Sequence, residues 1–243
     1  MKQAQENTFL KGIIDGIPIC LGYLSVAFAF GIFSVSNGLT AAEALLISMT
    51  NVTSAGQLAA VPIMVSGGTL LELALSQFVI NMRYSLMSVS LSQKFDSSVK
   101  LRDRFLIAFI NTDEVFAVAS SKKEVSRTYM FGLILTPYLG WSAGTIIGAV
   151  AGSILPAVVI SALGIAIYGM FIAIVVPVAK EDRHVLICVL IAIALSCTFK
   201  FLPPLADVHS GFVIIICSVI AAGFAALLFP IDNEAKEGET DEL

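Results

Sequence analysis

The residues best suited to chemistry are polar side chains placed inside apolar stretches long enough to cross a bilayer. Arg83 lies near the centre of one stretch, and the run Asn111–Glu114 interrupts another. An unpaired cation at membrane depth costs about 2.5 to 3.5 kcal/mol, and such groups are by default functional. Glu72 is eleven residues from Arg83, about 16 Å along a straight helix and too far for a direct pair. We therefore expect Asp113 or Glu114 to pair with Arg83, either for function or to join two helices.

The apolar stretch Ala41–Val65 is interrupted in a similar way. Ser54–Gln57 matches the capping-box pattern, and Asn111–Glu114 is its variant with asparagine first. Each run predicts a new helix that begins part-way through the membrane, over Leu58–Val65 and Val115–Ser121. Irregular backbone at that depth is tolerated only against protein or a wet cavity. The free N–H groups of such a helix start attract an anion such as a carboxylate.

These runs define one candidate binding site. Helix starts suit an anionic group and carboxylates suit a cationic one, so a zwitterion such as an α-amino acid satisfies both. The apolar surroundings suit an aliphatic side chain, although a cation or proton route would use the same acids. The candidate residues are Ser54, Gly56, Gln57, Asn81, Asn111 and Thr112 for the cargo, Asp113 and Glu114 for the ammonium group or a coupled proton, and Arg83 for charge pairing.

The composition requires a membrane protein. Of 243 residues, 57% are hydrophobic and 13% are charged, and the mean hydropathy is +0.92. This composition excludes a soluble enzyme and a nucleic-acid-binding protein. The sequence has no HExxH, P-loop or GxGxxG motif, and its four cysteines lie in apolar stretches without metal-ligand spacing. We therefore expect no catalysis, no cofactor and no metal.

The distribution of basic residues decides between two topologies, because Lys and Arg favour the cytoplasmic side of short loops. If every apolar window crossed the membrane with the N-terminus inside, the basic loop Gln93–Arg104 would face outward. If Ala41–Val65 and the short window Phe105–Ala119 enter and return on one side, all basic clusters become cytoplasmic. The expected fold is an all-α polytopic membrane helical bundle with about six full crossings, two re-entrant or broken helices and cytoplasmic termini. The remaining windows are Gly16–Ser36, Thr69–Leu91, Tyr129–Gly152, Pro156–Ala179, Val185–Leu202 and Gly211–Phe229.

The domain organisation follows from the same pattern. We expect residues 1–11 to be a cytoplasmic N-terminus, residues 12–230 a single membrane domain and residues 231–243 a disordered cytoplasmic tail. The tail carries six acidic residues against one lysine, so the low pI reflects this tail and not a basic ligand.

Several local patterns predict helix starts and packing. Thr40 and Thr69, each followed three residues later by glutamate, predict ordinary helix starts. The helix over Thr69–Leu91 is polar on two faces, so we expect it to touch protein or a cavity on both. Tyr23 and Trp141 are expected to be packing residues or interface anchors. Glycines every four residues predict close helix packing, as in Gly140, Gly144, Gly148 and Gly152.

A succession of short motifs runs in order over the first half of the chain, from about Gly12 to Ser121. They are Gly12–Pro18, Leu21–Tyr23, Ala27–Gly31, Ala55–Ala60, Asn81–Tyr84 and Thr112–Glu114. This succession resembles the AzlC/YgaZ family of branched-chain amino acid permeases. Family members usually read Phe-Ala-Gly-Ala-Ala-Gln where this chain has Val52–Gln57, and the added hydroxyl groups could alter the cargo preference.

The resemblance implies an exporter of valine, leucine, isoleucine and their analogues in the bacterial cytoplasmic (inner) membrane. It also implies a small hydrophobic AzlD-type membrane subunit as partner. Because no nucleotide motif is present, the proton gradient is the expected energy source, acting through Asp113 or Glu114. Two other interpretations stay open: a channel or uniporter for a small cation, and a non-transporting membrane subunit of a complex.

Overall fold

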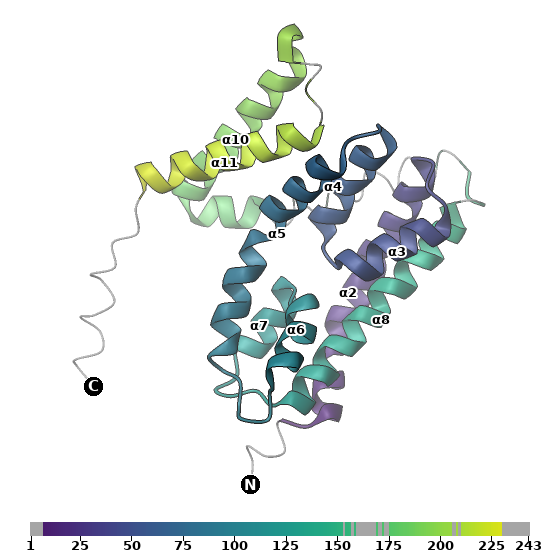
Figure 1. Ribbon diagram of the computed structural model, residues 1–243, viewed down its shortest axis with the longest axis vertical. Coiled ribbons are helices and arrows are strands. Elements are labelled where there is room, and N and C mark those ends of the chain that lie inside the picture. The colour runs from purple at the N-terminus through teal and green to yellow at the C-terminus, as the bar shows by residue number, and fades with distance from the viewer. Residues whose placement is uncertain are drawn as a thin grey trace. The chain divides into compact units, whose positions relative to one another are not determined.

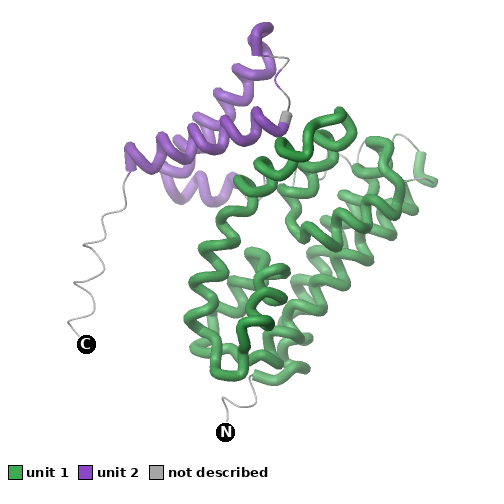
Figure 2. Tube along the Cα trace, viewed as in Figure 1, with its two compact units in different colours: residues 1–169 green, residues 170–243 purple. Residues whose placement is uncertain are grey.

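The computed structural model describes residues 7–152, 154–156, 158, 169, 172, 175–205, 208 and 210–229. Apart from one isolated bridge, all regular secondary structure in these residues is helical, which confirms the predicted all-α fold. The chain divides into two compact units, residues 1–169 and 170–243 (Figure 2). The domain bounds stay a prediction. The acidic tail and most of the window Pro156–Ala179 lie outside the described residues.

The described part of the first unit contains seven helices (Figure 1). The predicted starts at Thr40 and Thr69 are confirmed, because each hydroxyl accepts the backbone N–H of the glutamate three residues later. The helices are α2 (Phe9–Ser36), α3 (Ala41–Asn51), α4 (Ser54–Val65), α5 (Leu70–Ser92), α6 (Leu101–Phe109), α7 (Asp113–Ser120) and α8 (Arg127–Gly152).

Helices α2 and α8 pack side by side and form the frame of this unit (Figure 1). They run in the same direction, because Gly12 lies against Tyr129 and Gly31 lies against Thr145 further along both helices. Glycine lets the two backbones touch, as the predicted small-residue spacing requires. A Cβ atom built at Gly148 would lie 2.0 Å from a backbone carbonyl oxygen of α2.

Helices α3 and α4 form a hairpin that begins and ends at one end of the α2–α8 frame, the end where α2 terminates. α3 begins just after the C-terminal end of α2 and runs back beside α8, where the Ser48 and Thr145 hydroxyls share a 2.5 Å hydrogen bond. α4 then runs antiparallel to α5. Thr53 at its start contacts Tyr84, and Gly56 one turn later accepts a hydrogen bond from Gln77.

Helices α6 and α7 form a second hairpin that enters and returns at the opposite end. The segment after α5 lies beside the start of α8, since the Val125 N–H donates to the Lys94 carbonyl. α6 begins there, with Asp103 in its first turn paired to Arg127 at 3.0 Å. α7 ends there too, because the Lys94 ammonium donates to the carbonyl of Ser120.

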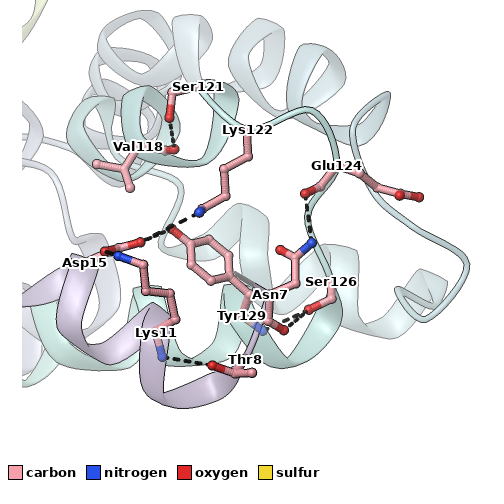
Figure 3. Close-up of polar contacts among 10 residues, drawn as sticks. All are labelled: Asn7, Thr8, Lys11, Asp15, Val118, Ser121, Lys122, Glu124, Ser126 and Tyr129. Atoms are coloured by element: carbon pink, nitrogen blue, oxygen red, sulfur yellow. Dashed lines mark hydrogen bonds and ion pairs between the residues drawn. The ribbon is translucent and has the colours of Figure 1, made fainter. Parts of the chain in front are cut away.

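Polar contacts tie the N-terminus of α2 to this same end (Figure 3). The Asp15 carboxylate accepts from Lys11 at 2.6 Å and from the Tyr129 hydroxyl at 2.9 Å, and Lys122 approaches it at 3.9 Å. The Ser126 hydroxyl donates to the carbonyl of Asn7 at 2.8 Å. The starts of α2 and α8 and the end of α7 are therefore fixed together.

The first unit thus holds two broken hairpins inserted from opposite ends, with α5 connecting them. Four described helices are long and apolar enough to cross a membrane, namely α2, α8, Arg183–Phe201 and Gly211–Leu228. The helical membrane fold is supported, and the count of about six crossings stays a prediction.

The described part of the second unit contains a helical pair. α10 (Arg183–Phe201) is followed by the short 3₁₀ helix η1 (Pro203–Leu205) and by α11 (Ser210–Leu228), which packs against α10. The Cys188 thiol of α10 lies 3.5 Å from the Ala221 carbonyl of α11.

Candidate functional site

Each hairpin is broken within two residues of the predicted position. Val52, between α3 and α4, has φ 45° and ψ 39°, a left-handed conformation that costs a β-branched residue on the order of 1 to 3 kcal/mol. Thr53 and Thr112 precede α4 and α7 in extended conformation, and neither side chain caps its helix. The predicted caps at Ser54 and Asn111 are therefore wrong. The residue before each helix is one position away from the predicted cap, and the first-turn N–H groups of α4 and α7 therefore have no side-chain cap.

Both breaks line one cavity of about 240 Å³. Asn81, which also lines it, is eleven residues from either end of α5, so the cavity lies half-way along that helix. Val52, Ala108 and Phe109 supply apolar walls. The polar lining residues are Thr50, Asn51, Asn81, Tyr84, Asn111 and Thr112.

Two amide oxygens in this lining are buried without a partner. The Asn81 amide donates through Nδ2 to Gln77 at 3.3 Å, and the Asn111 amide donates through Nδ2 to Ser88 at 3.2 Å. The oxygens Asn81 Oδ1 and Asn111 Oδ1 accept no hydrogen bond from the residues that the structure describes. A buried acceptor that receives no hydrogen bond costs about 1 to 3 kcal/mol. This cost indicates that a further donor, such as a ligand group, binds at these oxygens.

A chain of side-chain amides holds the first break against α5. Gln77 Oε1 accepts from Asn51 Nδ2 at 3.0 Å, and Gln77 Nε2 donates to the carbonyl of Gly56 at 2.9 Å. Any larger residue at Gly56 would disrupt this arrangement, because a Cβ atom there would lie 2.6 Å from Gln77 Oε1. Gly56 therefore serves the site by giving room to these amides.

Two of the charged residues beside the cavity, Arg83 and Asp113, are paired with each other. Arg83 Nη2 lies 2.7 Å from Asp113 Oδ2, and both side chains are about half exposed. The same guanidinium donates to the Tyr84 hydroxyl at 3.2 Å. Of the two acids expected to pair with Arg83, the structure selects Asp113, and this pair joins α5 to the first turn of α7.

Glu114 has a different partner. The Tyr23 hydroxyl of α2 contacts both the Glu114 carboxylate and the Thr112 hydroxyl, the latter at 2.6 Å. Tyr23 is buried, and its ring meets Trp141 edge to face with centroids 4.8 Å apart. Tyr23 and Trp141 therefore lie in the interior and are not interface anchors.

Gln57 belongs to a buried polar cluster and does not line the cavity. Its Oε1 accepts from the Trp141 indole at 3.2 Å and from the Ser48 hydroxyl at 3.4 Å. Its Nε2 has no partner among the described residues. The cluster joins α3, α4 and α8 behind the first break.

The structure brings most of the predicted residues together but gives them different positions. Asn81, Asn111 and Thr112 line the cavity, while Ser54 and Gly56 start α4 beside it. Sequence reasoning missed Tyr23 as a partner of the second break and gave no part in the site to Asn51, which lies directly before the first. The position of Asn51 at a predicted break was a usable signal, whereas nothing local marks Tyr23. Among the described residues, no group of three His, Cys, Asp or Glu side chains is arranged to hold a metal ion.

Comparisons with known proteins identify the family. The family model described as AzlC protein matches residues 18–155, more than half of the chain. The chain belongs to the AzlC family. An uncharacterized membrane protein of Archaeoglobus fulgidus is 36% identical over 184 residues, covering 75% of this chain and 80% of its own length. Inner membrane protein YgaZ of Escherichia coli is 31% identical over 195 residues, with 76% and 78% covered.

The match to the AzlC family includes both hairpins and α8, and therefore every residue that lines the cavity. A membrane protein of Helicobacter pylori is also similar, with 29% identity over 155 residues, covering 60% of this chain and 67% of its own length. No solved structure matches this AzlC-family chain. Membership is consistent with membrane transport.

Proposed function

We propose that this AzlC-family protein is a secondary transporter that exports branched-chain amino acids (valine, leucine, isoleucine and their analogues). The observation that carries the proposal is that two hairpins, inserted from opposite ends, place their breaks around one cavity half-way along α5. Discontinuous helices that meet near the middle of the membrane are a recurring substrate site of transporters with alternating access.

The cavity offers a partner to each charge of an amino acid. The unpartnered oxygens of Asn81 and Asn111 would accept from the ammonium group. The uncapped first turns of α4 and α7 would donate backbone N–H groups to the carboxylate. Val52 and Phe109 would contact the aliphatic side chain. A volume of about 240 Å³ suits a cargo smaller than the ligands of typical pockets, which measure about 300 to 1,000 Å³.

Glu114 is the acid that we propose for proton coupling. Asp113 already neutralises Arg83, so removal of its charge would leave a cation unpaired. Glu114 contacts the Tyr23 hydroxyl, and no described cation forms an ion pair with it. A proton on Glu114 would thus change the charge beside the cavity without breaking an ion pair.

Location and partner belong to the same proposal. The basic segments after α5 and after α7 lie at one end of the first unit together with the start of α2, as cytoplasmic loops would. We place this end in the cytoplasm and the protein in the bacterial inner membrane. A small AzlD-type membrane subunit is proposed as the partner on the strength of family membership.

Counterflow of labelled valine into proteoliposomes loaded with unlabelled valine tests the function, with and without the small subunit. Isobutylamine, which lacks the carboxylate, and isovalerate, which lacks the ammonium group, should each compete at least about tenfold more weakly than valine, because a hydrogen bond to a charged group contributes roughly 1.5 to 3 kcal/mol. No counterflow under either condition would disprove transport, and valine-independent current would favour a cation channel.

The variant Asn111→Leu tests the cargo site itself. It removes the unpartnered acceptor, so we expect valine affinity to fall about tenfold or more. The control is Asn37→Leu, because the Asn37 amide bonds only to Phe33 of its own helix, among the described residues. Equal affinity in the two variants would show that Asn111 does not contact the cargo.

A further inference from the structure

A second cavity in the first unit has a different chemical character. It lies between α5 and α6 and has a volume of about 240 Å³. Its lining is mostly apolar and includes Val89, Leu91, Leu101, Phe105 and Ile107. Such a surface offers little to either charge of a zwitterionic cargo, but it matches the hydrocarbon chain of a lipid.

One cation lines this apolar groove. The Arg104 guanidinium lies over the Phe95 ring, 5.5 Å from its centroid. Among the described residues, Arg104 forms no ion pair, whereas Arg127 nearby is paired with Asp103. The Lys94 ammonium is likewise occupied, because it donates to two backbone carbonyl oxygens. Arg104 is therefore the groove's available partner for an anion.

The charge of the surrounding segment favours an anionic ligand. Residues 94–104 carry four basic side chains against two acidic ones. The segment lies at the same end of the first unit as the basic residues Lys122 and Arg127. Basic pockets between membrane helices on the cytoplasmic side bind the head groups of anionic lipids.

We propose that this groove binds an anionic phospholipid, with its phosphate on Arg104 and one acyl chain against Val89 and Phe105. The bound lipid would hold α6 against α5. Ala108 and Asn111 line both this groove and the proposed cargo cavity, so the lipid would also support the position of Asn111. The proposal concerns binding alone and does not depend on the identity of the cargo.

Native mass spectrometry of the delipidated full-length protein tests the proposal. The protein is titrated with phosphatidylglycerol and with phosphatidylcholine of the same chain length, and inorganic phosphate is added as competitor. We expect phosphatidylglycerol to bind several-fold more tightly, and phosphate at the same concentration not to displace it. Equal affinity for both lipids would refute the proposal, and displacement by phosphate would identify a phosphate site without an acyl groove.

Three variants locate the site. Arg104→Gln should weaken phosphatidylglycerol binding about fivefold, since one basic residue near an anionic head group contributes about that factor. Val89→Trp should also weaken it by filling the groove while Arg104 stays in place. Lys123→Gln is the matched control, because Lys123 is exposed and does not line the groove.

The outcomes distinguish a specific lipid-binding site from nonspecific attraction of lipid to surface charge. Weak binding in both groove variants with normal binding in Lys123→Gln supports the proposal. An Arg104→Gln protein that binds like Lys123→Gln would overturn it, as would a Val89→Trp protein with unchanged affinity. The folded state of every variant is checked by far-ultraviolet circular dichroism. For Arg104→Gln and Lys123→Gln it is also checked by the emission of the single tryptophan, Trp141, which is buried and distant in sequence from the groove.

Discussion

Substitution of Gly148 by alanine tests the contact between α2 and α8 that holds both breaks in place. A Cβ atom at this position would lie 2.0 Å from the carbonyl oxygen of Phe28 and 2.7 Å from its carbonyl carbon. These are backbone atoms, so no side-chain rotation relieves the clash. Ordinary contact begins at 3.4 Å, and the two helices must therefore separate locally by more than an ångström.

The magnitude follows from two opposing effects. Overpacking of a tight contact lowers the free energy of unfolding by about 1 to 3 kcal/mol. Replacing glycine by alanine inside a helix raises it by up to about 1 kcal/mol. Because the clash is with backbone atoms at 2.0 Å, we expect the cost to lie in the upper part of its range and Gly148→Ala to destabilise the protein by about 1 to 2 kcal/mol. Gly22→Ala in α2 is the matched control, because a Cβ atom there meets nothing within 4 Å. Gly22→Ala should stabilise the protein by up to about 1 kcal/mol.

The assay is reversible unfolding of the purified protein in mixed micelles containing sodium dodecyl sulfate. Trp141 is the only tryptophan, lies in α8 and is 2% exposed, so its emission reports separation of the two helices directly. A Gly148→Ala protein as stable as the unmodified protein would refute the close contact. Equal losses in Gly148→Ala and Gly22→Ala would attribute the effect to glycine removal in general.

Two further predictions concern charge. Arg83→Met and Asp113→Asn should each destabilise the protein by about 1 to 3 kcal/mol, because each single variant leaves one charge unpaired. The double variant leaves neither charge and should recover most of the loss. Strictly additive changes in unfolding free energy would exclude an energetic coupling between Arg83 and Asp113. Burial raises the pKa of Asp103, but hydrogen bonds from the Lys100 amide and the Arg127 guanidinium outweigh it and hold the pKa below 3.8. Because the folded-state pKa is the lower one, this carboxylate stabilises the fold above about pH 4, and the stabilisation is lost as the pH falls through the folded-state value. Asp103→Asn should therefore show a smaller loss of unfolding free energy between about pH 6 and pH 3, and an unchanged acid slope would contradict this role.

The helices and several of their ends were predictable from the sequence, although α2 begins at Phe9 and the predicted window began at Gly16. Starts at Thr40 and Thr69 depend on hydrogen bonds within a single helical turn, so four residues are enough to specify them. The two breaks were placed to within two residues because polar runs at membrane depth require special surroundings. The caps predicted at Ser54 and Asn111 were wrong. The residues that precede α4 and α7 are Thr53 and Thr112, and both contact side chains of other helices, so a pattern within one helical turn was not sufficient there.

The partners of the site residues were predictable only in part. A charge at depth requires a counter-charge, and this requirement limited the partner of Arg83 to two acids. The choice of Asp113 over Glu114 depends on how α7 packs against α5. Gln57 was assigned to the cargo, yet it contacts Trp141 of a helix more than eighty residues away in the sequence.

The amino-acid sequence alone specifies what each segment requires: apolar length for crossing, glycine for close packing and a counter-charge for Arg83. These requirements are local, because they arise from the solvation and backbone hydrogen bonds of each segment. Tertiary structure decides how they are met. The opposed insertion of the two hairpins, the left-handed Val52 and the shared cavity arise only when α5 connects the hairpins inside the frame of α2 and α8. Contacts between distant helices are selected by packing of the whole unit, and no short stretch of sequence contains that information.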